Sequence, residues 1–143
     1  MQKEALRVID ANINRAKEGL RICEDICRFV LDNRGLAADL KRIRHGISVS
    51  AAELALFRQR VAERNGGADA GRHIIGRELK RDGVAGIFFA NIQRAKESCR
   101  VLEEFSKLSR KKASLKFKEL RYELYAIEKK ALKLIPYPES RNP

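Results

Sequence analysis

The chain has 143 residues and a mass of 16.3 kDa, which is the size of one domain. It carries 31 Lys and Arg against 19 Asp and Glu, so its formal net charge is +12 at pH 7. No apolar run is long enough to span a membrane, and the charged first residues do not form a secretory signal. The charge indicates an anionic partner and leaves nucleic acid, an acidic membrane surface and a phosphorylated small molecule as candidates.

The chain has three cysteines, an odd number in a sequence long enough to fold without disulfides. This count argues against a disulfide framework and for a reducing compartment, so we expect a cytoplasmic protein. Cys23 and Cys27 share one helix face, but their spacing is not repeated elsewhere. We therefore expect Cys23, Cys27 and Cys99 to fill the core rather than to hold a metal ion.

Good helix formers dominate the sequence, and all three prolines lie in its last eight residues. Four long helices are predicted, at about 3–31, 36–64, 84–108 and 113–134. A Gly-rich loop at 65–82 joins the second helix to the third, and a short Pro-containing tail follows at 136–143. The short connections predict antiparallel hairpins in one all-α domain, residues 1–135.

An internal repeat organises the helices. ANINRAKEGLRICEDICR at 11–28 aligns with ANIQRAKESCRVLEEFSK at 90–107, and nine of the eighteen positions are identical. The helices that follow also match, at 40–47 and 117–124. The chain therefore consists of two copies of one helical hairpin, about 3–64 and 83–134. Two hairpins are too few for a solenoid, so we expect a four-helix bundle with a pseudo-two-fold axis.

Six polar residues recur at related positions among apolar residues of these helices: Asn12, Arg15, Arg44, Asn91, Arg94 and Arg121. A helical wheel centred on Asn12 puts Asn12 and Arg15 on the apolar stripe of the first helix, and the other four share a helix face with apolar residues of their own helices. We therefore expect all six to face the interior. Buried guanidinium groups need partners, and few carboxylates share these faces. A bound phosphate would supply the negative charge, because its oxygens match the planar fork of arginine. The alternative is that Arg15 and Arg94 pair with Glu18 and Glu97 within their helices.

A second repeated set lies on the more polar side of the same helices. Glu18, Arg21 and Glu24 recur as Glu97, Arg100 and Glu103. The favoured interpretation is a solvated face with weak ion pairs. The alternative places one glutamate at the rim of a site, as a Mg²⁺ ligand or a proton acceptor.

The joining loop contains four glycines and one acidic residue, Asp69, in the segment NGGADAGRHIIGR. Glycines allow backbone N–H groups to turn toward an anion, which favours a phosphate-binding loop. The chain has no GxxxxGK[ST] sequence, so this is not a P-loop. A flexible connector is the alternative.

The strings IDANINRAKEGLRICEDICRFVL, LKRIRH, NIQRAKESCRVLEEFSKLS and FKELRYELY resemble the all-α hydroxymethylpyrimidine phosphate kinase family of thiamine biosynthesis. The resemblance covers about residues 5–130. The same domain also occurs fused to the N-terminal side of thiamine phosphate synthase. Arg64, Asp69 and Gly71 resemble the family's central R…D-x-G segment, although the residues between and after them depart from it.

The resemblance implies ATP-dependent phosphorylation of 4-amino-5-hydroxymethyl-2-methylpyrimidine phosphate to the diphosphate, with Mg²⁺. Inward arginines from both repeats suit such a transfer, so Arg15, Arg94 and Asp69 are the candidate catalytic residues. The candidate phosphate and substrate ligands are Asn12, Asn91, Arg44, Arg121 and Gly71. Asp69 is the first candidate to hold Mg²⁺, with Glu18 and Glu97 as second choices. Thiamine phosphate synthase is a candidate protein partner.

Two alternatives belong to other functional classes. Basic runs such as Arg110-Lys111-Lys112 favour a nucleic-acid-binding helical module, but the chain has no helix-turn-helix signature and no Trp, and we expect no nucleic-acid partner. A non-catalytic module associated with thiamine phosphate synthase is the other alternative.

Overall fold

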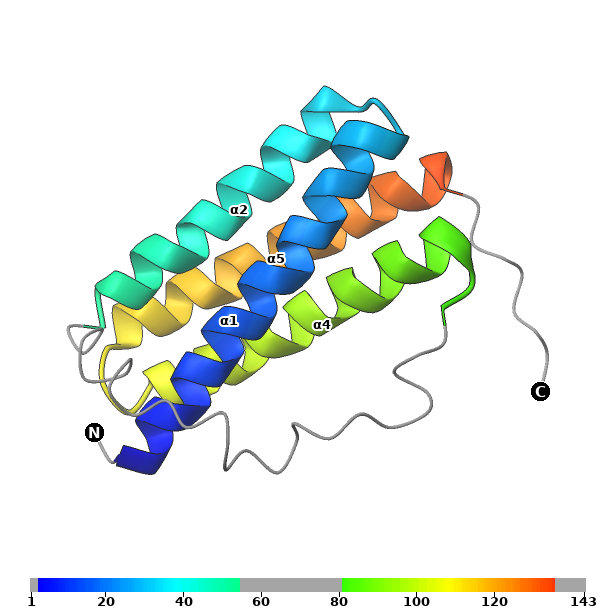
Figure 1. The fold of residues 1–143 in the computed structure, drawn as a ribbon. Coiled ribbons are helices and arrows are strands. Elements are labelled where there is room, and N and C mark those ends of the chain that lie inside the picture. The colour runs from blue at the N-terminus through cyan, green and yellow to red at the C-terminus, as the bar shows by residue number, and fades with distance from the viewer. Residues whose placement is uncertain (1–2, 55–80, 136–143) are drawn as a thin grey trace.

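A computed structural model of the chain describes residues 3–54 and 81–135, and every regular element within these two ranges is helical. The elements are α1 (Lys3–Asp25), the single π-helical turn η1 (Ile26–Val30), α2 (Arg34–Ala52), α4 (Gly83–Ser106) and α5 (Lys111–Leu134). Figure 1 shows the four long helices side by side in one bundle. The predicted all-α bundle of two hairpins is confirmed.

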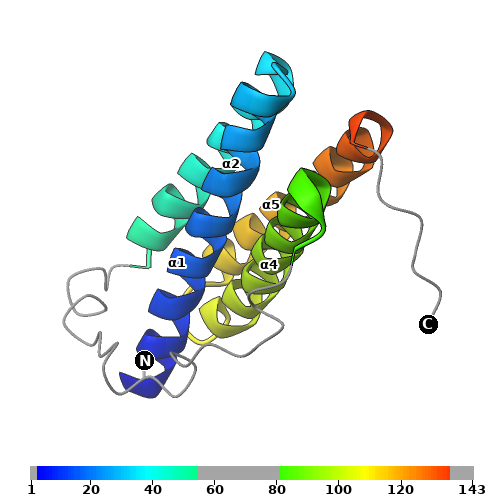
Figure 2. The same cartoon turned by 45° about the vertical axis from the view of Figure 1, so that its right-hand side comes forward.

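The four helices form a ring of contacts. Helix α1 packs against α2 and α4, and α5 packs against the same two helices from the other side. Figures 1 and 2 show that neighbouring helices run in opposite directions, with α1 and α2 forming one hairpin and α4 and α5 the other. The end of α2 and the start of α4 therefore lie at opposite ends of the bundle.

The helix ends follow local signals only in part. Asp32 adopts a left-handed conformation (φ 51°), and the Asn33 side chain then accepts a hydrogen bond from Leu36 N at 3.0 Å to cap α2. The predicted second helix runs to Arg64, but α2 ends at Ala52. Leu54 N bonds to Ala51 O instead of continuing the α-helical pattern. The sequence has no Gly or Pro at this point, so propensity alone does not predict this helix end. The rest of the predicted helix, residues 55–64, and most of the predicted loop lie outside the described residues.

The core is formed by aliphatic side chains from all four helices, with Phe88 and Phe117 as its largest fully buried members. Helices α1 and α4 approach closely at Gly19, where an added Cβ would lie 2.8 Å from the Asn91 carbonyl oxygen. No larger residue fits this crossing without moving one backbone. The three cysteines are free thiols and buried, as predicted.

Because the thiols are buried, we expect them to react slowly in the folded protein. Burial raises the pKa of Cys27 to about 11 and that of Cys99 to about 12, and it raises that of Cys23 further. Unfolded thiols ionise near pH 9, so the stability from these neutral thiols is complete below pH 9 and lost as pH rises toward 12. Alkylation by iodoacetamide at pH 8 tests this: we expect slow labelling without urea and fast labelling with it.

Candidate functional site

The two arginines predicted to be catalytic do not face the interior. Arg15 and Arg94 are both exposed, so the predicted inward orientation is wrong. The buried face of α1 includes Ile9, Ala16 and Leu20, and its centre lies about 60° from Asn12 on the helical wheel. A helical wheel centred on Asn12 therefore places Arg15 on the apolar stripe. When the wheel is centred on the buried residues, Arg15 lies outside that stripe. The same offset applies to Arg94 in α4.

The paired asparagines are held by their own helices. The side-chain nitrogen of Asn12 donates to Val8 O at 2.8 Å, and that of Asn91 donates to Ile87 O at 2.7 Å. Asn12 is buried, and Asn91 lies at the α1–α4 crossing, where its carbonyl meets Gly19. Both side-chain amides thus donate to the backbone of their own helices, and their predicted contact with substrate stays a prediction.

The other two arginines are half-buried, and each has a buried carboxylate as its partner. Arg44 Nε donates to Glu24 Oε2 at 3.0 Å, and Arg121 Nη2 donates to Glu103 Oε2 at 3.0 Å. Glu24 and Glu103 are only 6% and 5% exposed. The expected shortage of negative charge around Arg44 and Arg121 is therefore wrong, because the repeat supplies one glutamate to each arginine. Helical spacing alone placed these glutamates at the edge of the buried face.

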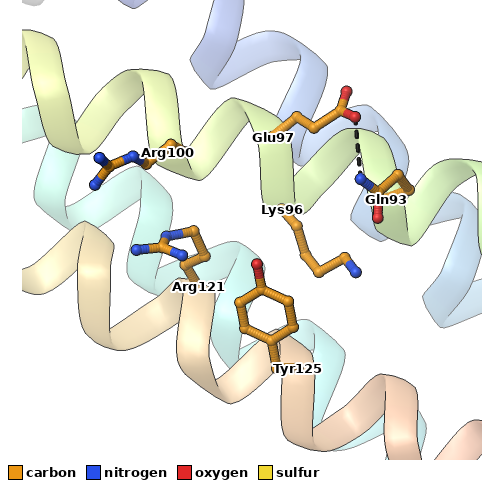
Figure 3. A pocket seen from close by; sticks show the side chains of 6 residues that line it. All are labelled: Gln93, Lys96, Glu97, Arg100, Arg121 and Tyr125. Atoms are coloured by element: carbon orange, nitrogen blue, oxygen red, sulfur yellow. Dashed lines mark hydrogen bonds between the residues drawn. The ribbon is translucent and has the colours of Figure 1, made fainter.

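A pocket of about 330 Å³ lies between α4 and α5. Its lining residues are Gln93, Lys96, Glu97, Arg100, Arg121 and Tyr125. Figure 3 shows Arg100 and Arg121 reaching from the two helices toward the same side, with the Tyr125 ring between Arg121 and Lys96. Three cationic side chains, one carboxylate and one aromatic ring thus line a single concavity, with the Lys96 ammonium on the other side of the Tyr125 ring from the two guanidinium groups (Figure 3).

Carboxylates hold these cations in place. Glu103 accepts from Arg121 with one oxygen and lies 3.1 Å from Arg100 Nη1 with the other. Lys96 is buried to 7% exposure and pairs with Glu128. Burial lowers the pKa of Arg121, because it disfavours the charged guanidinium. Hydrogen bonds with Tyr125 and Glu103 have the larger effect, so the pKa of Arg121 is raised above its ordinary value. The pocket therefore presents oriented cationic groups whose charge is partly balanced by Glu103 and Glu128, and an anion would bind to their remaining N–H donors.

The predicted metal ligands do not form a metal centre within the described residues. Glu18 and Glu97 are exposed, and Glu97 accepts a hydrogen bond from Gln93 Nε2 at 3.0 Å. Across residues 3–54 and 81–135, no three His, Cys, Asp or Glu side chains lie close enough together to hold a metal ion. Asp69 and Gly71, together with Arg64, lie outside the described residues.

Arg15 and Arg94 flank the α1–α4 contact rather than the pocket. Arg15 lies one turn before Gly19, which contacts α4, and Arg94 holds the equivalent place on α4. Arg94 and Lys96 are two residues apart, so they point from nearly opposite sides of α4, about 160° apart. One phosphate cannot contact both of them.

Because Arg15 and Arg94 are exposed, we expect the double variant Arg15→Ala/Arg94→Ala to fold normally. Neither arginine bonds to another residue of the described part of the chain, so the free energy of unfolding should change by less than about 0.5 kcal/mol. Urea unfolding measures this change. A larger loss would contradict the assignment of both side chains to an exposed surface.

Sequence reasoning missed Lys96, Arg100 and Tyr125 as site residues. The lysine and the arginine recur in the first copy, as Lys17 and Arg21. That Lys96 and Arg100 are identical in both copies was the signal that could have found them. The pattern of a single helix cannot show that α5 places Arg121 and Tyr125 beside these two residues. Residues that the wheel assigned to solvent thus line the concave surface between two helices.

These features define a basic all-α bundle, built from a duplicated hairpin, with a cationic pocket between two of its helices. The chain belongs to the ThiD2 family, whose model matches residues 7–130. No solved structure matches the chain. None of the helices that the structure describes is long and apolar enough to cross a membrane.

The similar curated proteins are named thiamine-phosphate synthases. One from Nostoc punctiforme is 37% identical over 131 residues, which cover 90% of this chain and 35% of the relative. One from Synechocystis is 38% identical over 123 residues, which cover 85% of this chain and 34% of the relative. One from Rhodopirellula baltica is 32% identical over 125 residues, which cover 87% of this chain and 33% of the relative. The chain therefore spans about a third of the length of these relatives, whose names associate the family with thiamine biosynthesis.

Proposed function

We propose that the chain is a kinase of thiamine biosynthesis that converts 4-amino-5-hydroxymethyl-2-methylpyrimidine phosphate to the diphosphate with ATP. A phosphate oxygen of the pyrimidine substrate attacks the γ-phosphorus, the bond to the β–γ bridging oxygen breaks, and ADP leaves. The observation that carries the proposal is the cationic pocket of Lys96, Arg100 and Arg121 in a ThiD2 family member. Such a transfer joins two anions, so it depends on positioning and charge neutralisation.

The proposal includes Mg²⁺, which would neutralise charge on the ATP phosphates. Mg²⁺ is commonly held by one or two carboxylates together with substrate phosphates, so a single acidic residue is enough to anchor it. Asp69 is the proposed ligand, with Glu18 and Glu97 as the alternatives. Arg15 and Arg94 stay candidate catalytic residues on the α1–α4 side. They are an alternative to the cations of the pocket, because Arg94 and the pocket residue Lys96 lie on different sides of α4.

A coupled assay of ADP release tests the proposal, with Mg-ATP and the pyrimidine monophosphate as substrates. We expect turnover that depends on both substrates, and Arg100→Met should lower kcat/KM at least about tenfold. Arg42→Met is the matched control, because Arg42 is equally exposed (58% against 55%) and also bonds to a glutamate, but it lies outside the pocket. Folded protein without turnover would contradict the kinase.

The variant Arg15→Ala/Arg94→Ala decides between the two faces in the same assay. Loss of turnover with this variant, together with wild-type rates for Arg100→Met, would move the reaction to the α1–α4 side. The reverse pattern would support the pocket. Both variants are expected to fold, so the comparison reports on chemistry rather than on stability.

A second candidate function is a non-catalytic module associated with thiamine-phosphate synthase. It is favoured by the length of the relatives, which carry that name and are about three times as long as the matched region. Tight binding to a separate thiamine-phosphate synthase by folded protein that releases no ADP would support this alternative.

A further inference from the structure

We infer that the α4–α5 pocket is the site of the phosphate monoester substrate, and that it binds a single small aromatic ring against Tyr125 and its phosphate against Arg100 and Arg121. This inference rests on the proposed function and adds the location and orientation of one substrate. It also assigns that substrate to the second hairpin alone.

The ring site is formed by Tyr125, whose side chain is 46% exposed although it lines the pocket. Lys96 Nζ lies 4.8 Å from the centre of its ring, and the Tyr122 ring is 6.0 Å away, centre to centre. A half-exposed ring held by neighbours on two sides loses little conformational freedom when a ligand stacks on it. Aromatic stacking of this kind suits a planar heterocycle such as a pyrimidine.

The phosphate site is formed by cations that retain free donors. Arg121 bonds Glu103 through Nε and Nη2 and also hydrogen-bonds Tyr125, which leaves the remaining N–H groups of its five for a ligand. Arg100 pairs with Glu103 and Glu104 through Nη1, at 3.1 Å from each carboxylate. Glutamates thus orient both guanidinium groups before the ligand arrives, which lowers the entropic cost of binding.

The size of the pocket favours a small monoester over a nucleoside triphosphate. Its volume of about 330 Å³ lies at the lower end of the range of ligand pockets, which runs from about 300 to 1,000 Å³. One ring and one phosphate fit this space together with the cations. An adenosine triphosphate has a larger ring system, a ribose and two further phosphates.

The first hairpin repeats the cations but not the ring. Lys17, Arg21 and Arg44 correspond to the pocket cations, whereas Ser48 stands in place of Tyr125. The Ser48 hydroxyl donates to Arg44 O at 3.4 Å, four residues earlier in α2. Within the described part of the two hairpins, this aromatic position is occupied in the second copy and not in the first, so we expect one ring-binding site.

Isothermal titration calorimetry of the intact chain tests this, with the pyrimidine monophosphate, ADP and inorganic phosphate as separate probes. We expect the monophosphate to bind with one site per chain. Tyr125→Ala should weaken that binding about tenfold or more and leave inorganic phosphate unchanged. Phe29→Ala is the control, since Phe29 is an exposed aromatic residue that lies outside the pocket. Tyr125→Phe should retain most of the affinity.

Three results would overturn the inference: two equal sites per chain, unchanged affinity in Tyr125→Ala, or displacement of the monophosphate from the pocket by ADP. Its failure can be told apart from failure of the kinase. If monophosphate binding depends on Tyr125 but the coupled assay shows no ADP release, the proposed site would stand and the proposed kinase activity would be refuted. Normal turnover by Tyr125→Ala with an unchanged KM for the monophosphate would retain the kinase and remove this site.

Discussion

Replacing Glu103 with alanine is expected to lower the free energy of unfolding by about 3 kcal/mol. Glu103 is 5% exposed and bonds to two arginines, one of which, Arg121, has a side chain only 14% exposed. Without the carboxylate, the half-buried guanidinium of Arg121 loses its partner while still shielded from water. Urea denaturation at pH 7 measures the loss.

Glu104 provides the matched control, since it is the next residue and also bonds to Arg100. Its side chain is exposed, so Glu104→Ala should leave the unfolding midpoint nearly unchanged. Glu103→Gln retains the shape of the side chain and removes its charge, so it should fall between the parent and Glu103→Ala. Equal stability of Glu103→Ala and Glu104→Ala would show that the Glu103–Arg121 pair contributes nothing to folding.

The second large effect is expected at the crossing of α1 and α4. Gly19→Ala should lower the free energy of unfolding by about 2 kcal/mol, because the new Cβ would lie 2.8 Å from the Asn91 carbonyl oxygen. That oxygen belongs to the backbone of α4, so it cannot move aside as a flexible side chain would. Thermal or urea unfolding detects the change.

Gly35→Ala is the control for this substitution. Gly35 also lies in a helix, but an added Cβ there meets only the Asn33 side chain, at 3.6 Å. Alanine is the better helix former, so Gly35→Ala should be neutral or slightly stabilising. If Gly19→Ala were stabilising as well, the close helix crossing would be refuted.

Much of the fold follows from sequence pattern. Alanine, leucine and charged helix formers, the position of the prolines and the 11–28 repeat together predict two antiparallel hairpins, which the bundle contains. The end of α2 at Ala52 was not predictable in this way, because the residues that follow are also good helix formers. The hydrogen bond from Leu54 N to Ala51 O marks that end, and propensity does not predict it.

The site was less predictable than the fold. The repeat singled out Arg44 and Arg121 as half-buried arginines, but it did not show that Glu24 and Glu103 neutralise them. It also favoured Arg15 and Arg94 as inward residues, which depended on where the centre of the helical wheel was placed. A shift of about 60° in that centre moves a side chain from the core to the surface.

The sequence by itself determined the helical class, the duplication and the excess of positive charge, because these depend on local propensity and on composition. The tertiary structure decided which of the cations converge. Lys96 and Arg100 come from one helix, and Arg121 and Tyr125 from another, so only the packing of α4 against α5 makes them a pocket. Helical periodicity describes one surface at a time, whereas a binding site between helices depends on how two surfaces meet.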